Sequence, residues 1–116
     1  MTSFKEEYPF NKRYEESNKI MKKYVDRIPC IVEKNPKCKK ITQIDKRKFL
    51  VPKDLTISQF TYVIRKRLNV MPQEAIFILV NNSIPSNSNT IFDLYNKQKD
   101  TDGFLYFKYA SENTFG

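Results

Sequence analysis

The stretch KFLVPKDLTISQFTYVIRKRL, residues 48–68, decides the fold class because it joins a short strand to an amphipathic helix. Its start is mostly apolar and closes on a proline, which is typical of a strand that ends there. Thr56 and Gln59 have the spacing of a capping box, which predicts a helix from Ile57 to about Leu68. Apolar residues recur on one face of this helix, so we expect it to cross and cover a sheet.

The residues before this stretch predict helices and the partner strand. A helix is expected at 10–24, with a shorter helical turn before it around 3–8. The aromatic and apolar residues that share one face of the longer helix are Phe10, Tyr14, Met21 and Tyr24. Residues 28–33 are largely apolar and predict a strand, and the lysine-rich segment at 34–45 predicts a polar connection to the next strand.

The residues after it predict the rest of the sheet. A short strand is expected at 76–80, a helix from Thr90 to about Asn96, and a last strand at 104–109. In the last strand the residues expected to face inward are Leu105, Phe107 and Tyr109. No element signal follows, which predicts a mobile tail. Two strands, a long helix and two further strands predict an α+β domain of the ubiquitin-like β-grasp type.

Composition excludes most catalytic classes. The 116 residues suit one domain, and the net charge of +8 favours acidic partners such as anionic lipid, nucleic acid or acidic peptide segments. The absence of histidine removes the commonest general base and zinc ligand, and two glycines are too few for a phosphate-binding loop. We therefore expect no enzymatic activity, no metal site and no cofactor.

Cysteine usage and the lack of a long apolar run indicate a reducing compartment, the cytoplasm or the nucleus. Cys30 lies in an apolar strand and is expected in the core. Cys38 lies in a lysine-rich loop and is expected as a free surface thiol.

Eight short stretches follow the order and spacing of one protein family. They are FKEEYPF at 4–10, YVDRIP at 24–29, IVEK at 31–34, DKRKFLVP at 45–52, IRKR at 64–67, VNN at 80–82, GFLY at 103–106 and FG at 115–116. Each is a weak signal alone, and together they are specific. The chain resembles the GABARAP-type autophagy ubiquitin-like modifiers from end to end. The resemblance implies a ubiquitin-like β-grasp with two extra N-terminal helices.

With this resemblance the chain is expected to divide into an N-terminal helical extension at 1–24, a ubiquitin-like domain at 25–109 and a flexible conjugation tail at 110–116, within one structural domain. In the family the terminal glycine, here Gly116, is adenylated and passed to cysteines of an activating and a conjugating enzyme. It is then joined to the amine of phosphatidylethanolamine, the one covalent group expected. Glycine suits these steps because a Cβ would hinder attack on the carbonyl.

The strand at 48–52 has apolar side chains on both faces, with Phe49 and Val51 on one side and Leu50 on the other. This pattern indicates burial on both faces, or core on one face and a pocket on the other. The resemblance implies the second arrangement, in an edge strand to which partner peptides add by β-augmentation. Those peptides carry an aromatic residue and, three positions later, an aliphatic one.

The resemblance also assigns residues to this site. The aromatic pocket would be lined by Glu16, Ile20, Pro29, Ile31, Lys48, Leu50 and Phe104. The aliphatic pocket would be lined by Phe49, Val51, Pro52, Leu55, Phe60 and Val63. The residues expected to attract acidic flanks of the peptide are Arg27, Lys46 and Lys48. A second surface would comprise Ile76, Phe77 and Ile78, and Arg65 aligns with a residue that contacts the processing protease.

Other interpretations stay open at this point. The apolar pocket residues also fit ordinary core packing, Lys46 and Lys48 fit a solvated charge pair, and Arg65 fits a helix-end charge. A nucleic-acid-binding module would share the basic charge, but most aromatics fall at inward positions and no RNP-type or finger motif is present. A modifier joined to a protein would differ only in the acceptor amine, which the sequence does not show.

The expected function is that of a lipid-conjugated adaptor, monomeric when soluble and without nucleic acid. It is expected in the cytoplasm and, when lipidated, on the autophagosome or a related vesicle, or on a plastid membrane in a plastid-bearing protist. Its expected partners are the activating and conjugating enzymes, a deconjugating cysteine protease, membrane phospholipid, and cargo receptors with the aromatic-x-x-aliphatic motif.

Overall fold

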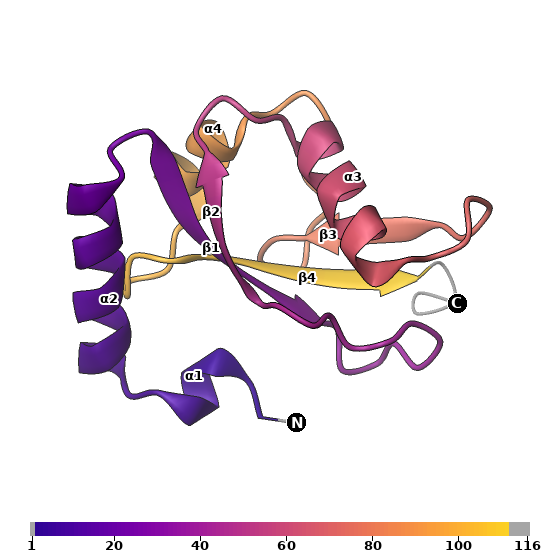
Figure 1. Cartoon of the computed structure of the whole chain (residues 1–116), viewed down its shortest axis with the longest axis horizontal. Coiled ribbons are helices and arrows are strands. Elements are labelled where there is room, and N and C mark those ends of the chain that lie inside the picture. The colour runs from indigo at the N-terminus through magenta and orange to yellow at the C-terminus, as the bar shows by residue number, and fades with distance from the viewer. Residues whose placement is uncertain (1, 112–116) are drawn as a thin grey trace.

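The computed structural model describes residues 2–111 and shows a four-stranded mixed sheet with helices on both sides (Figure 1). The helices are α1 (Phe4–Glu7), α2 (Phe10–Lys23), α3 (Ile57–Leu68) and α4 (Ile91–Gln98), and the strands are β1 (Arg27–Lys34), β2 (Lys48–Pro52), β3 (Ile76–Leu79) and β4 (Leu105–Ser111). The strand order is β2-β1-β4-β3, with β1 and β4 parallel at the centre and antiparallel partners outside. The expected β-grasp with two N-terminal helices is confirmed.

Local sequence signals account for the helix boundaries. Thr56 accepts a hydrogen bond from the Gln59 N–H, and the Gln59 side chain accepts one from the Thr56 N–H, so the predicted capping box is confirmed. Asn69 ends α3 in the left-handed region with φ of 54°. The predicted bounds of α3 therefore agree with the structure, because each end is set by residues of its own segment.

One face of the sheet, beneath α3 and α4, is an apolar core. The predicted inward residues of β4 are buried there, as are Ile28 and Val32 of β1. The Phe60 ring of α3 lies between two strands, with its centroid 5.9 Å from that of Phe49 and 5.1 Å from that of Phe107. Alternate residues of each strand supply this face, as the period of two requires.

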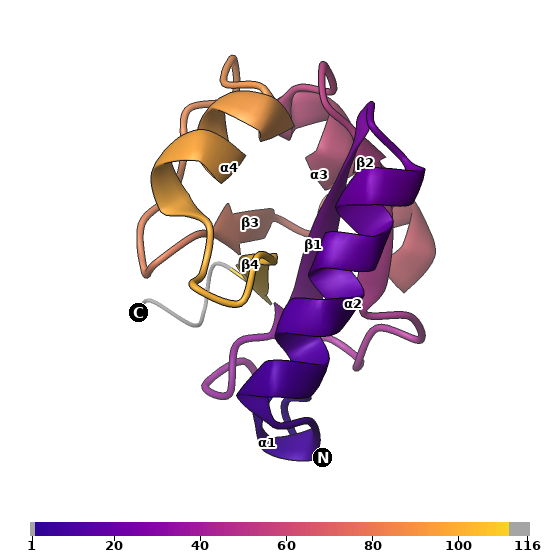
Figure 2. The same cartoon turned by 90° about the vertical axis from the view of Figure 1, so that its left-hand side faces the viewer.

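The other face of the sheet is covered by α1 and α2, and Figure 2 shows α2 running across β1 and β2. The apolar cluster here is small and consists of Phe4, Ile31 and Phe104, with Ile20 and Tyr106 packed against it. The rings of Phe4 and Phe104 meet edge to face at 5.3 Å. Because β1 is covered on both faces, its middle residues are all buried.

The face of α2 that packs on the domain is partly polar, and the expected apolar face is wrong except at Met21, which packs against the core. Phe10, Tyr14 and Tyr24 are 48%, 47% and 39% exposed, whereas Arg13 is 8% and Ser17 1% exposed. The physical reason is that this side of α2 meets the turn before β4, whose polar groups require hydrogen-bonding partners. The aromatic side chains are left at the surface, where two of them stack with centroids 5.8 Å apart.

Asp102 is the centre of this polar contact and is fully buried. Arg13 donates from Nε to Asp102 Oδ2 at 3.0 Å, and the Tyr106 hydroxyl donates to the same oxygen at 2.5 Å. The Phe104 N–H donates to Asp102 Oδ1 at 2.9 Å, and Ser17 Oγ donates to the Asp102 main-chain oxygen at 2.6 Å. Burial, and then the hydrogen bond to Asp102, raises the pKa of Tyr106 far above its usual value.

The last strand is longer than expected. Ala110 and Ser111, predicted to begin the tail, pair with Phe77 and Ile76 of β3. Pairing with β3 sets the C-terminal end of β4, and no signal within the segment indicates where that end lies. The remaining residues of the predicted tail, 112–116, lie outside the described part of the chain, and Gly116 is among them.

Of the two predictions for the cysteines, one is confirmed and one is wrong. Cys30 is buried as predicted, and burial raises the pKa of its thiol. The prediction of a surface thiol at Cys38 is wrong, because this side chain is 2% exposed. Its Sγ lies 3.8 Å from Ser111 Oγ, where the 35–47 loop folds over the end of β4.

Among residues 2–111, no helix is both long and apolar enough to cross a membrane.

Candidate functional site

The outer edge of β2 is the part of the sheet best placed to accept another strand. β2 stands at one end of the strand order, so within residues 2–111 no strand pairs with its outer side. Two hydrogen bonds fix the phase of its ladder with β1: Val32 N to Arg47 O at 2.7 Å, and Lys53 N to Asp26 O at 3.0 Å. Both bonded pairs, 32 with 47 and 26 with 53, continue the register in which β1 pairs with β2.

The phase of the ladder tells which main-chain groups of β2 face outward. Hydrogen-bonded and non-hydrogen-bonded pairs alternate along antiparallel strands. Phe49 and Val51 therefore face β1 with their N–H and C=O groups, while the corresponding groups of Lys48 and Leu50 face away from the sheet. Those outward groups have the spacing that an added strand needs.

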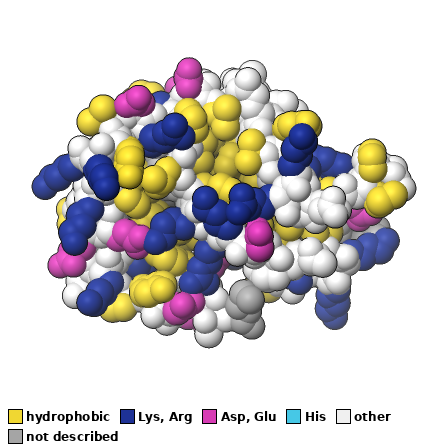
Figure 3. All heavy atoms as spheres, viewed as in Figure 1, with side chains coloured by type: hydrophobic (Ala, Val, Ile, Leu, Met, Phe, Trp, Pro, Cys, Tyr) yellow, Lys and Arg dark blue, Asp and Glu magenta, His cyan; other side chains and the backbone are white. Residues whose placement is uncertain are grey.

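A hollow of about 680 Å³ lies beside this edge, between α2 and β2. Its lining residues are Glu16, Ile20, Lys46, Arg47, Lys48 and Leu50. Figure 3 shows hydrophobic side chains interspersed with lysines and arginines on the face that carries α2, β2 and α3. An apolar floor with basic groups around it suits a hydrophobic side chain that is flanked by acidic residues.

The basic side chains at the hollow already have partners. The Lys48 ammonium pairs with the Glu16 carboxylate across the mouth of the hollow. Arg47 pairs with Glu7, and the Lys46 ammonium lies 5.2 Å from the centroid of the Phe49 ring. The two ion pairs are partly exposed, so each contributes little to stability and can exchange for a charge on a bound peptide.

The predicted aromatic-pocket residues fall into two layers. Glu16, Ile20, Lys48 and Leu50 line the hollow directly. The other members, Pro29, Ile31 and Phe104, are buried and lie beneath the surface. Sequence reasoning missed Arg47 as a lining residue, although its position between two predicted site lysines was a signal.

The predicted aliphatic-pocket residues also divide. Phe49, Val51 and Phe60 are buried in the main core. Pro52 and Leu55 are half-buried, and Val63 on α3 is 40% exposed. A ligand at this end of β2 would therefore touch the rim residues first, with the aromatic core beneath them.

Arg65 is engaged within the domain. Its Nη1 donates to the Glu74 main-chain oxygen at 2.5 Å, and its Nη2 donates to the Met71 oxygen at 3.1 Å. These bonds hold the connection between α3 and β3. The expected contact of Arg65 with a protease stays a prediction.

The predicted second surface is mostly buried. Ile76 and Ile78 point into the core, and Phe77 between them is half-buried. Phe77 also borders a hollow with Ile84 and Pro85. Of the three predicted residues, Phe77 is thus the one that a partner could reach.

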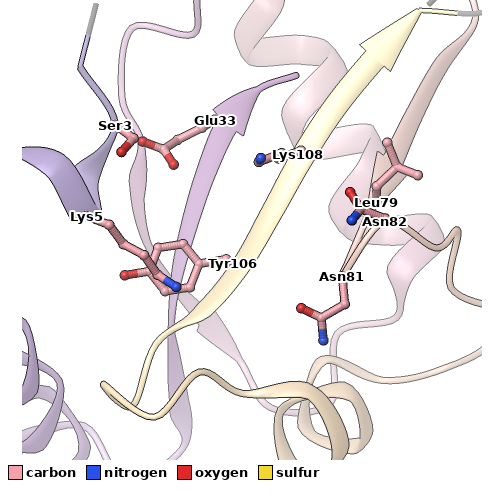
Figure 4. Close-up of a pocket in the computed structure, with 8 residues that line it drawn as sticks. All are labelled: Ser3, Lys5, Glu33, Leu79, Asn81, Asn82, Tyr106 and Lys108. Atoms are coloured by element: carbon pink, nitrogen blue, oxygen red, sulfur yellow. The ribbon is translucent and has the colours of Figure 1, made fainter. Parts of the chain in front are cut away.

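A third hollow, of about 270 Å³, lies between α1, β4 and the end of β3 (Figure 4). Several of its polar groups are already engaged. Lys5 pairs with Asp100 at 2.5 Å, and Glu33 accepts the Phe4 N–H at 2.7 Å. Burial opposes ionisation of Asp100, but the hydrogen bonds from Lys5 and the Asp102 N–H, together with the charges of Lys5 and Arg13, outweigh burial and lower the pKa of Asp100. No residue of β2 lines this hollow.

Comparison with known proteins identifies close relatives of the whole chain. The family model described as "Autophagy protein Atg8 ubiquitin like" matches residues 12–116. Autophagy-related protein 8 of Candida glabrata is 53% identical over 115 residues, which cover 99% of this chain and 97% of that protein. Autophagy-related protein 8A of Oryza sativa is 51% identical over 115 residues, which cover 99% of this chain and 96% of that protein.

A solved structure agrees with these matches. The crystal structure of Trypanosoma brucei ATG8 superposes with a TM-score of 0.91 at 40% sequence identity. The match covers 100% of this chain and 99% of that one.

Proposed function

The chain belongs to the Atg8 family of ubiquitin-like autophagy proteins, and on that premise we propose that it is a non-catalytic modifier joined through Gly116 to phosphatidylethanolamine. The conjugated form resides on an autophagosome or related membrane, and the free form is cytoplasmic. The activating enzyme, the conjugating enzyme and a deconjugating cysteine protease act on the C-terminal residues. The terminal glycine supports this chemistry because its carbonyl is open to attack by an amine.

On the membrane the protein recruits receptors that carry an aromatic-x-x-aliphatic segment. The observation that carries this part is the outward edge of β2, with its Lys48 and Leu50 main-chain groups beside the hollow that α2 and β2 enclose. The peptide adds as a further strand, its aromatic side chain enters the hollow, and its aliphatic side chain packs near Leu55 and Val63. Such an addition would also remove an exposed strand edge from solvent.

The conjugation is tested by mass spectrometry of the C-terminal peptide from the membrane fraction of cells that express the protein. We expect phosphatidylethanolamine on the Gly116 carboxylate, and we expect Gly116→Ala to abolish it without altering peptide binding. Thr114→Ala is the matched control in the same segment and should leave the adduct in place. A free Gly116 in every fraction would rule out conjugation, and an adduct on a protein amine would identify the acceptor as protein.

The docking edge is tested by titrating a receptor-type peptide against Leu50→Arg. A charge placed in the hollow should weaken binding by about 2 kcal/mol, roughly thirtyfold in Kd. Asn96→Arg adds the same charge at an exposed position on α4 and should leave Kd unchanged. Equal titration curves for Leu50→Arg and the unmodified protein would remove this hollow from the proposed site.

A further inference from the structure

Arg27, at the start of β1, reaches over the free edge of the sheet. It stands opposite Pro52 in the register, and its Nη1 donates to the Leu50 main-chain oxygen at 3.2 Å. The ladder phase places that oxygen on the outer side of β2. The guanidinium therefore occupies a main-chain acceptor at the centre of the edge that a docking peptide would use.

The charge of Arg27 is available for a stronger partner. Within residues 2–111, Arg27 forms no ion pair with a carboxylate, unlike Lys48 and Arg47 nearby. Its bond to a neutral carbonyl is exposed to solvent and can be exchanged. A guanidinium binds a carboxylate more strongly than it binds an amide oxygen, because two charge-assisted hydrogen bonds can form.

The layout of the site shows where that carboxylate would be. The aromatic hollow lies at Lys48 and Leu50, and the aliphatic rim lies toward Pro52, so the peptide runs parallel to β2. In an extended peptide the two anchors, three positions apart, face opposite sides. The second intervening residue faces the same side as the aromatic anchor and lies roughly 7 Å further along. That step leads from the hollow toward Arg27, which shares the α2 side of the sheet with Ile31.

We propose that Arg27 is a guard of the β2 edge that makes docking selective: it blocks the Leu50 oxygen against neutral peptides and releases it to peptides with a carboxylate at the second intervening position. The inference rests on the proposed docking function and adds to it a regulating side chain. A neutral peptide must displace the guanidinium without giving it a new partner. An acidic peptide supplies the partner and receives the Leu50 oxygen for its own N–H.

The test measures the Kd of each of two peptides for each of three proteins by isothermal titration calorimetry. The peptides share one aromatic-x-x-aliphatic sequence and differ only in Glu or Gln at the second intervening position. The proteins are the unmodified chain, Arg27→Met, and the matched control Lys46→Met, which loses the same charge from the same site without touching the edge oxygen. A guarding contact predicts opposite effects of Arg27→Met on the two peptides.

We expect Arg27→Met to bind the Gln peptide roughly fivefold more tightly and the Glu peptide roughly fivefold more weakly. Lys46→Met should weaken both peptides or neither, without this inversion. In the free protein, the carbonyl carbon shift of Leu50 should also change in Arg27→Met and stay unchanged in Lys46→Met.

Equal or weaker binding of the Gln peptide by Arg27→Met would overturn the guard and leave Arg27 as a simple attractor of acidic groups. An unchanged Leu50 carbonyl shift would overturn it independently of any peptide. If the unmodified protein bound neither peptide, the docking function would itself be wrong and the guard would be rejected with it. The first two outcomes leave docking intact, so the two failures are distinguishable.

Discussion

The two faces of the sheet hold their helices by different means. Under α3 and α4 the contact is apolar, with Phe60 packed between aromatic rings of two strands. Under α2 a small apolar cluster is joined by one buried carboxylate, Asp102, which Arg13 and Ser17 reach from the helix. The comparison teaches that helices of similar length and pattern can dock by burial or by directed hydrogen bonds.

The two kinds of contact respond differently to damage. Apolar packing has no preferred direction, so its loss is shared by all elements that meet in the core. A buried ion pair is directional, and removal of one partner leaves a charge without solvent or counter-ion. We therefore expect core substitutions to lower global stability and network substitutions to release α2 first.

The two largest expected effects come from Phe60→Ala and Asp102→Leu, which lie on opposite faces of the sheet. Asp102→Leu should lower the free energy of unfolding by about 3 kcal/mol, because Arg13 keeps its charge in a buried place. Phe60→Ala should cost about 4 kcal/mol through the lost transfer energy and the cavity. Urea unfolding gives the totals, and hydrogen exchange gives their location.

Hydrogen exchange should show loss of protection confined to α2 in Asp102→Leu and spread over the sheet in Phe60→Ala. The control is Arg13→Met combined with Asp102→Leu, which removes both charges and should recover at least half of the loss. A double variant as unstable as the single one would mean that the buried charge is not the cause.

A smaller effect is expected from Gly103→Ala, in the turn between Asp102 and β4. Gly103 has φ of 91°, and a Cβ there would lie 2.3 Å from Ser17 Oγ and 3.0 Å from its Cβ. The strained backbone and the contact with α2 together should cost about 2 kcal/mol. Thermal unfolding should show a lower Tm for this variant and no change for Thr101→Ala in the same turn.

Adding Ser17→Ala to Gly103→Ala separates the two causes. The double variant removes the contact with Oγ but keeps the positive φ. The drop in Tm that Gly103→Ala causes should therefore be smaller when it is added to Ser17→Ala than when it is added to the unmodified protein. If it regains nothing, the backbone conformation accounts for the whole effect and the close approach of α2 is unimportant.

The smallest effect concerns a polar group on the apolar face, the hydroxyl of Tyr109. The Tyr109 hydroxyl donates to the Thr42 oxygen and accepts from the Ile44 N–H, each at 2.8 Å. Burial raises the pKa of Tyr109 from 10.0 to about 12. Tyr109→Phe should cost about 1 kcal/mol at neutral pH, because the two loop groups lose their partner.

The pH dependence checks the same contact. The folded state keeps the Tyr109 proton to a higher pH than the unfolded state, so its contribution is complete below pH 10 and falls between pH 10 and 12. The stability difference between the unmodified protein and Tyr109→Phe should shrink over that interval. Urea unfolding at pH 8, 10 and 11 measures it, and a constant difference would contradict the buried hydroxyl.

The predictions from sequence succeeded where a signal lies within one segment. The capping residues of α3, the inward alternation of β4 and the core position of Cys30 were all readable in this way. They failed where a distant partner decides the outcome. Cys38 is buried because the loop folds over β4, and β4 continues to Ser111 because β3 pairs with it.

The predictions for the candidate site also succeeded where the signal is local and failed where distant segments meet. The strand that forms the edge, and the basic residues beside it, followed from the pattern at 45–52 together with the family resemblance. The depth of each pocket residue did not follow from the pattern. Phe104 lies beneath the hollow, whereas Arg47 lines it. Depth depends on which helix covers which strand, and no single segment contains that information.

Local periodicity and caps were sufficient for the element order and the β-grasp of this chain, because the signal for each element lies within a few residues. The contact of α2 with the domain required the assembled molecule. Arg13 and Asp102 are 89 residues apart, and Arg27 meets the Leu50 oxygen across 23 residues. A hydrogen bond has a partner, a distance and a direction, and only the packed chain brings such distant groups into that geometry.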